Sequence, residues 1–149
     1  MPVMGVAKFM HFFRIAGSLD VDKNDLKRYL DFVNQKLYDL LLIGQAAAKA
    51  NVRDIIEVRD LPITKGLQES MHGFRRIDEE IELGPILEYL SAQPPLDLSL
   101  SEDTQARLPQ IVGGLSVALA RTFKTIDPGM KRPRTPEWEI VFKIFDQLL

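Results

Sequence analysis

Cysteine is absent from this 149-residue sequence. Its absence excludes disulfide bonds, zinc ribbons and thiol catalysis. Histidine is nearly absent as well, since only His11 and His72 occur. Neither histidine has a metal-binding side chain three or four residues after it, and Glu69, three residues before His72, adds only one ligand on the same turn. We therefore expect no metal site.

Long apolar runs are also missing. The longest lies within Leu37–Ile43 and is much shorter than the roughly 20 residues that cross a bilayer. The apolar stretch Phe9–Phe13 is interrupted by His11, and no small-residue cleavage site follows it. These features predict a cytoplasmic protein with no membrane partner.

Charge of neither sign is in excess. The chain holds 19 basic and 21 acidic residues and has a net charge of −2. The first 83 residues contain 12 basic and 13 acidic residues, and the remainder contains 7 and 8. Proteins that coat DNA are usually strongly basic because they bind by neutralising phosphates. This balance predicts weak binding to DNA, if the chain binds DNA at all.

Constellations of catalytic side chains are missing too. Ser70 and His72 lie two residues apart and would face different sides of a helix. Gly113 and Gly114 lack the lysine that follows a phosphate-binding glycine loop. The acidic run at residues 78–82 is typical of a solvated helix end. We expect no catalytic residue, no cofactor and no enzymatic activity.

What the sequence does contain is helical periodicity, in the order short, long, short. Apolar spacing predicts a short helix over Val6–Ala16, and Asp22 is expected to cap a long helix that ends near Ala50. The β-branched stretch Val52–Arg59 is expected to be briefly extended. Asp60 then caps a third helix, with proline in its first turn. The buried face of that helix is expected to contain Ile63, Leu67, Met71, Phe74, Ile77 and Ile81.

The same order of elements follows in the second half. Pro85–Ala92 is predicted to be a short helix, and the Ser-x-x-Glu pattern at residues 99–102 predicts a capping box for a long helix over about Leu100–Ile126. Pro109 should kink that helix or break its first turns. Thr135 begins the last helix.

This repeat of pattern, without marked identity between the halves, predicts the architecture. We expect an all-α protein with one domain over residues 1–149. Its first pseudo-repeat covers about residues 1–83 and its second about residues 84–149. Each is a short–long–short helix unit.

Arg53 and Asp60 carry the first resemblance to a known family. The segment Val52–Leu61 resembles the loop and third-helix start of archaeal histones, in which an arginine pairs with an aspartate seven residues later. The pairing fastens a loop that would otherwise be free, and the carboxylate also caps a helix. The resemblance implies that Arg53 and Asp60 form such a structural clip.

The whole chain resembles a family of uncharacterised bacterial proteins with two histone folds in tandem, notably at Leu19–Arg28 and Pro94–Leu98. The resemblance implies an intrachain pseudo-dimer whose two long helices cross as in a pair of histones. The second half departs from the pattern. Thr135 stands in the place of Asp60, and Pro128 or Lys131 lies where the arginine is expected.

The implied fold also predicts where charges meet. In a histone pair, the loop before one long helix lies beside the loop after the other. One end of the molecule would then gather six cations as candidate DNA contacts, namely Lys23, Lys27, Arg28, Lys131, Arg132 and Arg134. The acidic residues expected beside them are Asp20, Asp22, Asp25 and Asp127.

The opposite end is predicted to be acidic and to repel phosphate. Its expected acids are Asp54, Glu57, Asp60, Asp97, Glu102 and Asp103, with Arg53 and Arg59 as the cations against them.

Two hypotheses of function remain open. The first is weak, sequence-independent binding of double-stranded DNA through the basic end. The second is a protein-interaction or scaffold module that binds no nucleic acid and whose partner is unknown. In both cases we expect a monomer or a weak homodimer, because the second unit covers the apolar stripe of the first.

Overall fold

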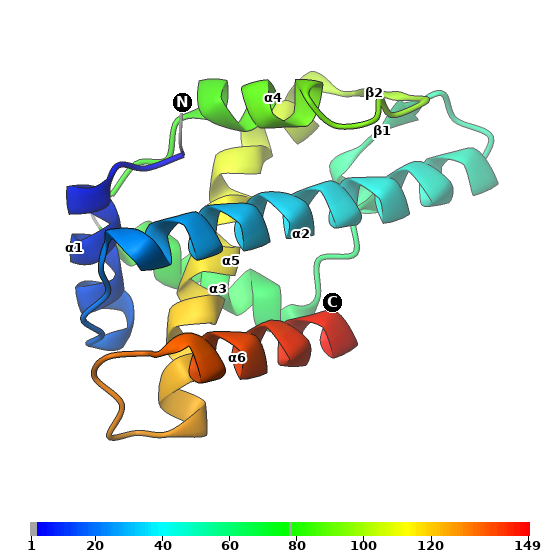
Figure 1. Cartoon of the computed structure of the whole chain (residues 1–149). Coiled ribbons are helices and arrows are strands. Elements are labelled where there is room, and N and C mark those ends of the chain that lie inside the picture. The colour runs from blue at the N-terminus through cyan, green and yellow to red at the C-terminus, as the bar shows by residue number, and fades with distance from the viewer. Residues whose placement is uncertain (1–2, 78) are drawn as a thin grey trace.

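Two sets of three helices make up most of this chain. The structure is a computed structural model that describes residues 3–77 and 79–149. The helices in Figure 1 are α1 (Val6–Gly17), α2 (Lys23–Ala50), α3 (Lys65–Arg76), α4 (Leu83–Ser91), α5 (Glu102–Ile126) and α6 (Thr135–Leu148). The predicted all-α class and the short–long–short order of each half are confirmed for the described residues. The fourth helix begins two residues before the predicted Pro85.

Two very short strands join the halves at one end of the molecule. β1 (Ile55–Ile56) follows α2, and β2 (Ser99–Leu100) precedes α5. The strands pair in parallel, with Ile55 opposite Ser99. The backbone N–H of Ser101 extends the pairing, because it donates to the carbonyl of Ile56 at 3.0 Å. Of the stretch Val52–Arg59 that was predicted to be briefly extended, Ile55 and Ile56 form a strand with a partner in the other half, whereas Val58 and Arg59 lie in a 3-10 turn.

The other end of the molecule has the converse contact. There the backbone N–H of Asp20, just before α2, donates to the carbonyl of Lys131, just after α5, at 2.7 Å. Between the two ends α2 passes across α5 (Figure 1), and the hydroxyls of Tyr29 and Ser116 share a buried hydrogen bond of 2.7 Å. The segment after α2 is thus bound to the segment before α5, and the segment before α2 is bound to the loop after α5.

Helix α2 begins where the sequence predicts. The side chain of Asp22 accepts hydrogen bonds from the backbone N–H groups of Asn24 and Asp25. The Asp25 carboxylate in turn accepts from the backbone N–H of Asp22 at 3.1 Å. This reciprocal capping box satisfies N–H groups that have no partner inside the helix. It fixes the start of α2 next to the Asp20–Lys131 contact.

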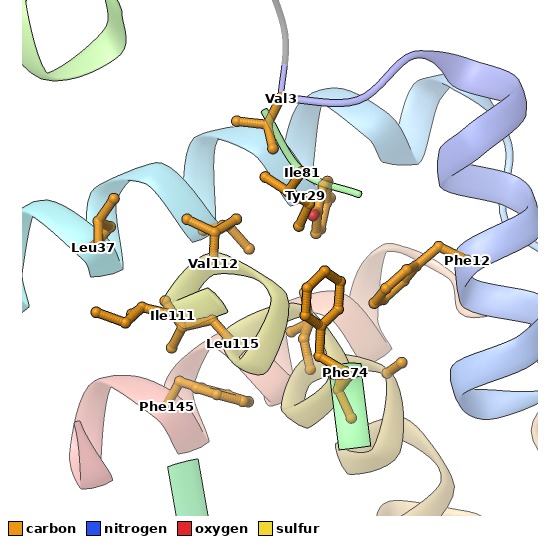
Figure 2. Close-up of a cluster of buried hydrophobic side chains, with 14 of the residues drawn as sticks. Val3, Phe12, Tyr29, Leu37, Phe74, Ile81, Ile111, Val112, Leu115 and Phe145 are labelled. Atoms are coloured by element: carbon orange, nitrogen blue, oxygen red, sulfur yellow. The ribbon is translucent and has the colours of Figure 1, made fainter. Parts of the chain in front are cut away.

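Helix α5 forms the centre of the core. From Ile111 to Ala120 every residue except Ala118 is buried. A helix that is apolar on all sides needs neighbours on all sides. Side chains from four other helices surround it in Figure 2, namely Phe12 of α1, Tyr29 and Leu37 of α2, Phe74 of α3 and Phe145 of α6.

Helix α6 packs beside α2 through aromatic and charged contacts. The rings of Phe32 and Phe142 stack with their centroids 4.3 Å apart. The ammonium of Lys36, whose side chain is almost fully buried, lies 2.6 Å from a carboxylate oxygen of Asp146. Lys36 can therefore lie in the interface between the two helices, because its methylene groups are buried while its ammonium is paired with a carboxylate.

Helix α3 lies so close to α5 that side chains are excluded at the contact. A Cβ atom on Gly113 would sit 2.4 Å from the ring of Phe74, and one on Gly114 would sit 2.4 Å from the side chain of Met71. The two adjacent glycines therefore allow α3 to pack closely against α5.

Three sequence-based predictions about the second long helix are corrected or refined. Its cap is Ser101, whose hydroxyl accepts from the N–H of Thr104 at 3.1 Å, so the predicted capping box at residues 99–102 is wrong. Ser99 and Leu100 are extended because they pair with β1. The helix starts at Glu102 and continues through Pro109 to Ile126, so the proline does not break its first turns.

The prediction that Asp60 caps the third helix is also wrong. Asp60 ends a 3-10 turn, η1 (Val58–Asp60), and α3 begins only after Thr64, whose hydroxyl accepts from the N–H of Leu67. Proline disfavours a helical conformation at the residue before it, and Leu61, before Pro62, is indeed extended.

The end of the third helix differs as well. It stops at Arg76, because Ile77 is extended, so Ile77 and Ile81 lie beyond the helix on which they were predicted. Ile81 is nevertheless buried. Ile63, also predicted on that helix, lies before its cap residue. Asp78, in the acidic run, lies outside the described residues.

The glycine contact yields the first prediction. Gly113→Ala should lower the free energy of unfolding by about 1–3 kcal/mol, because overpacking at Phe74 outweighs the roughly 1 kcal/mol that alanine gains in helix propensity. Urea unfolding followed by circular dichroism measures the change.

Gly84→Ala is the matched control, since a Cβ at Gly84 meets nothing within 4 Å. It should be neutral or slightly stabilising. Equal stability of the two variants would contradict the proposed packing of α3 on α5.

Candidate nucleic-acid interface

The six cations predicted to meet do lie on adjoining segments. Lys23, Lys27 and Arg28 occupy the first two turns of α2, and Lys131, Arg132 and Arg134 lie in the loop between α5 and α6. The hydrogen bond from the Asp20 N–H to the Lys131 carbonyl joins these segments. They form the basic end of the molecule, the name used below for these six residues.

Half of the basic end is already neutralised within the chain. Lys27 pairs with Asp31 at 3.2 Å, Arg28 with Asp25 at 3.7 Å, and Arg134 with Glu137 at 3.2 Å. The Lys27 and Arg134 side chains are largely exposed, so their pairs exchange readily with solvent ions and contribute little to stability. They compete with any phosphate for the same cations.

The other three cations are Lys23, Lys131 and Arg132. None has an ion pair with the residues that the structure describes. Arg132 lines a hollow of about 450 Å³ with Arg14 and three carboxylates, those of Asp20, Asp22 and Asp25. Desolvation raises the pKa of Asp25 from its ordinary value. The basic end is therefore a mixed surface, in which cations project beside acids.

The start of α6 differs from the arginine–aspartate pattern of the first half. In the described residues the Thr135 hydroxyl has no hydrogen bond from Lys131, and Pro128 has no donor to offer. Arg28 fills that role from the other half, since its guanidinium donates to the Thr135 hydroxyl at 2.6 Å. One cation of the basic end is thus occupied in fastening α2 to α6.

Arg53 and Asp60 form a two-pronged ion pair. The Nη1 atom of Arg53 lies 2.7 Å from Oδ2 of Asp60, and Nη2 contacts Oδ1. The backbone N–H of Glu57 also donates to Oδ2, at 2.8 Å. The Asp60 side chain is only 3% exposed. The hydrogen bonds from Arg53 lower the pKa of Asp60 to about 2.

The two histidines lie apart. His11 faces Glu79 at 3.5 Å, and Nδ1 of His72 faces the guanidinium of Arg75 at 3.3 Å. Across residues 3–77 and 79–149, no three side chains of the metal-binding types gather. Within the same ranges no helix is long and apolar enough to span a membrane.

One basic feature was not predicted from the sequence. Arg59, Arg75 and Arg107 line a single hollow beside η1, α3 and α5. Arg59 was expected at an acidic end, and no role was predicted for Arg75 or Arg107. The three arginines come from segments far apart in the chain, and they lie together only because α3 packs on α5.

These observations define the class of protein as an all-α chain of two similarly ordered halves, joined crosswise at their loops. The chain belongs to the family described as a domain of unknown function (DUF1931), which matches residues 9–146.

Relatives of this chain occur in bacteria. A crystal structure of a Thermus thermophilus protein is 51% identical, with a TM-score of 0.94 and 99% of each chain covered. A crystal structure of an Aquifex aeolicus protein is 29% identical, with a TM-score of 0.81 over 96% of this chain and 94% of that one. An uncharacterised protein of Aquifex aeolicus (strain VF5) is 29% identical over 144 residues, 97% of this chain and 84% of its own.

The ion pair of Asp60 predicts how stability depends on pH. The folded pKa, about 2, lies below the ordinary value of 3.8. Ionised Asp60 therefore favours the fold, with its contribution fully present above about pH 4 and lost as the pH falls through 2. At neutral pH, Asp60→Asn should cost about 1–3 kcal/mol of unfolding free energy.

Urea titrations of the wild type and the variant at a series of pH values test this. The difference between them should shrink as the pH approaches 2. Asp54→Asn, at an exposed carboxyl in the same loop, is the control and should change little. A difference for Asp60→Asn that stays constant over the whole range would contradict the assigned pairing.

Proposed function

We propose that this chain is a tandem histone-fold pseudo-dimer that binds double-stranded DNA weakly and without sequence preference through its basic end. The histone-fold interpretation is supported by the repeated short–long–short order and by the crossing of α2 and α5. It is further supported by the crosswise loop contacts, β1 with β2 and Asp20 with Lys131.

The observation that carries the DNA proposal is the Asp20–Lys131 backbone contact. It holds the loop after α5 against the start of α2. Lys23, Lys131 and Arg132 thereby gather at one end with no intrachain ion pair among the described residues. Phosphate oxygens are suitable partners for such cations, and contacts to phosphate carry no sequence information.

The surrounding charges limit the strength of this binding. The net charge is −2, and three carboxylates share a hollow with Arg132. About three to five phosphate contacts would give a slope of about −3 to −5 in a plot of log affinity against log salt. The proposal includes no catalytic step and no cofactor, and it assigns the chain to the cytoplasm.

A second candidate function is a scaffold that binds another protein. A groove of about 460 Å³ between α3, α5 and α6 favours it. Apolar side chains such as Leu67 and Phe145 line the groove, and Leu148 at its rim is 75% exposed. Exposed apolar surface of this kind is typical of interaction sites.

A gel-shift titration with random duplex DNA at two salt concentrations separates the two functions. The wild type should shift the DNA at low salt and lose affinity steeply as salt rises. Lys131→Gln combined with Arg132→Gln should abolish the shift without unfolding the chain, because both residues are exposed in a loop.

Arg76→Gln combined with Lys143→Gln is the matched control, since it removes one arginine and one lysine that are exposed outside the basic end and have no ion pair with a described residue. It should leave the shift nearly unchanged. Absence of any shift by the wild type at low salt would reject DNA binding and favour the scaffold.

The pseudo-dimer also predicts the oligomeric state. A single histone unit needs a partner to bury its apolar stripe, and here the partner is the other half of the chain. Sedimentation equilibrium should give a folded species near the monomer mass of 16.9 kDa, or a weak dimer. An obligate dimer that unfolds on dilution would contradict the pseudo-dimer.

A further inference from the structure

Three arginines converge on one hollow at the end of the molecule opposite the basic end. Arg59 follows β1, Arg75 lies in the last turns of α3, and Arg107 lies in the first turns of α5. The hollow has a volume of about 420 Å³, within the usual size range of small-molecule sites. We call it the arginine hollow.

Among residues 3–77 and 79–149, no carboxylate lines the arginine hollow. Asp60 interacts electrostatically with Arg59, but it is engaged by Arg53 through both of its oxygens and by the backbone N–H of Glu57. None of the three lining arginines forms a direct ion pair with a described residue. The hollow beside Arg132 differs, because three aspartates line it. Positive charge in the arginine hollow is therefore not offset by its own walls.

Arg75 is held in place by the side chains of Gln110 and His72. Its Nη2 atom donates to the side-chain oxygen of Gln110 at 2.9 Å, and its Nη1 atom faces Nδ1 of His72 at 3.3 Å. A guanidinium only donates, so Nδ1 accepts and the proton of a neutral His72 ring sits on Nε2. That N–H is a further donor on a residue that lines the hollow.

The remaining lining of the arginine hollow is mixed, because Gln68 and His72 are polar and Val58 and Ile63 are apolar. Val58 and Ile63 are half-buried and expose apolar surface there, whereas Leu61 and Met71 are almost fully covered. Guanidinium groups beside an apolar surface suit a ligand that combines an anionic group with an apolar group. Arginine binds phosphate by paired N–H donors, a geometry that lysine does not offer.

We propose that the arginine hollow binds the phosphate group of a small molecule whose apolar part lies against Val58 and Ile63. Arg59, Arg75 and Arg107 donate to the phosphate oxygens. The proposal is independent of DNA binding at the basic end, because the two surfaces share no residue.

Isothermal titration calorimetry on the full chain tests the proposal with three probes. Phenyl phosphate has both the phosphate and an apolar ring, inorganic phosphate lacks the ring, and benzoate has the ring with a carboxylate. Phenyl phosphate should bind most tightly, with a dissociation constant of about a millimolar or below. Arg75→Gln and Arg107→Gln, on different helices, should each weaken its binding by roughly ten- to a hundredfold.

Arg76→Gln is the matched control, because Arg76 follows Arg75 on α3, is exposed and does not line the hollow. It should bind phenyl phosphate like the wild type. Thermal melts of all variants establish that they are folded, and loss of binding by a folded Arg107→Gln chain supports the site even if Arg75→Gln unfolds.

Four results would overturn the proposal. They are the absence of saturable binding by phenyl phosphate, equal affinity for benzoate, equal loss in Arg76→Gln, and displacement of phenyl phosphate by duplex DNA. The last would make the hollow a DNA contact. Failure of the DNA proposal is read separately, as the absence of a gel shift by the wild type at low salt, and leaves the phenyl phosphate result untouched.

Discussion

The burial of α5 on all sides is the constraint on which the rest of the structure depends. Its middle turns are buried on almost every side, so they are stable only when other helices surround them. Gly113 and Gly114 let α3 approach one side closely, while α2 crosses another at the Tyr29–Ser116 bond. Because α2 and α3 come from the first half and α5 from the second, neither half has a complete core alone.

The same crossing determines where charges meet. With α2 laid across α5, each loop beside one long helix reaches a loop beside the other, through β1–β2 at one end and Asp20–Lys131 at the other. One end then mixes cations with aspartates, while the other holds the arginine hollow, which no described carboxylate lines. The two proposed ligands, duplex phosphate and a small phosphate, follow from these two distinct arrangements of charge.

Local features were predictable from the sequence, and features that depend on distant partners were not. The Asp22–Asp25 capping box involves neighbours in the chain, and it lies where the pattern predicts. The start of α5 was misplaced because Ser99 pairs with Ile55, a contact that no local rule supplies. The error at Asp60 was avoidable, since the proline after Leu61 disfavours a helix there. Arg59, Arg75 and Arg107 meet only through tertiary packing.

Amide NMR spectra of the full chain titrated with a short DNA duplex test the central claim most directly, because they report each loop separately. The account predicts saturable shifts confined to residues 20–28 and 130–135, reversed by added salt as expected for phosphate contacts. Shifts centred on Arg59, Arg75 and Arg107, or no shifts at low salt, would contradict it.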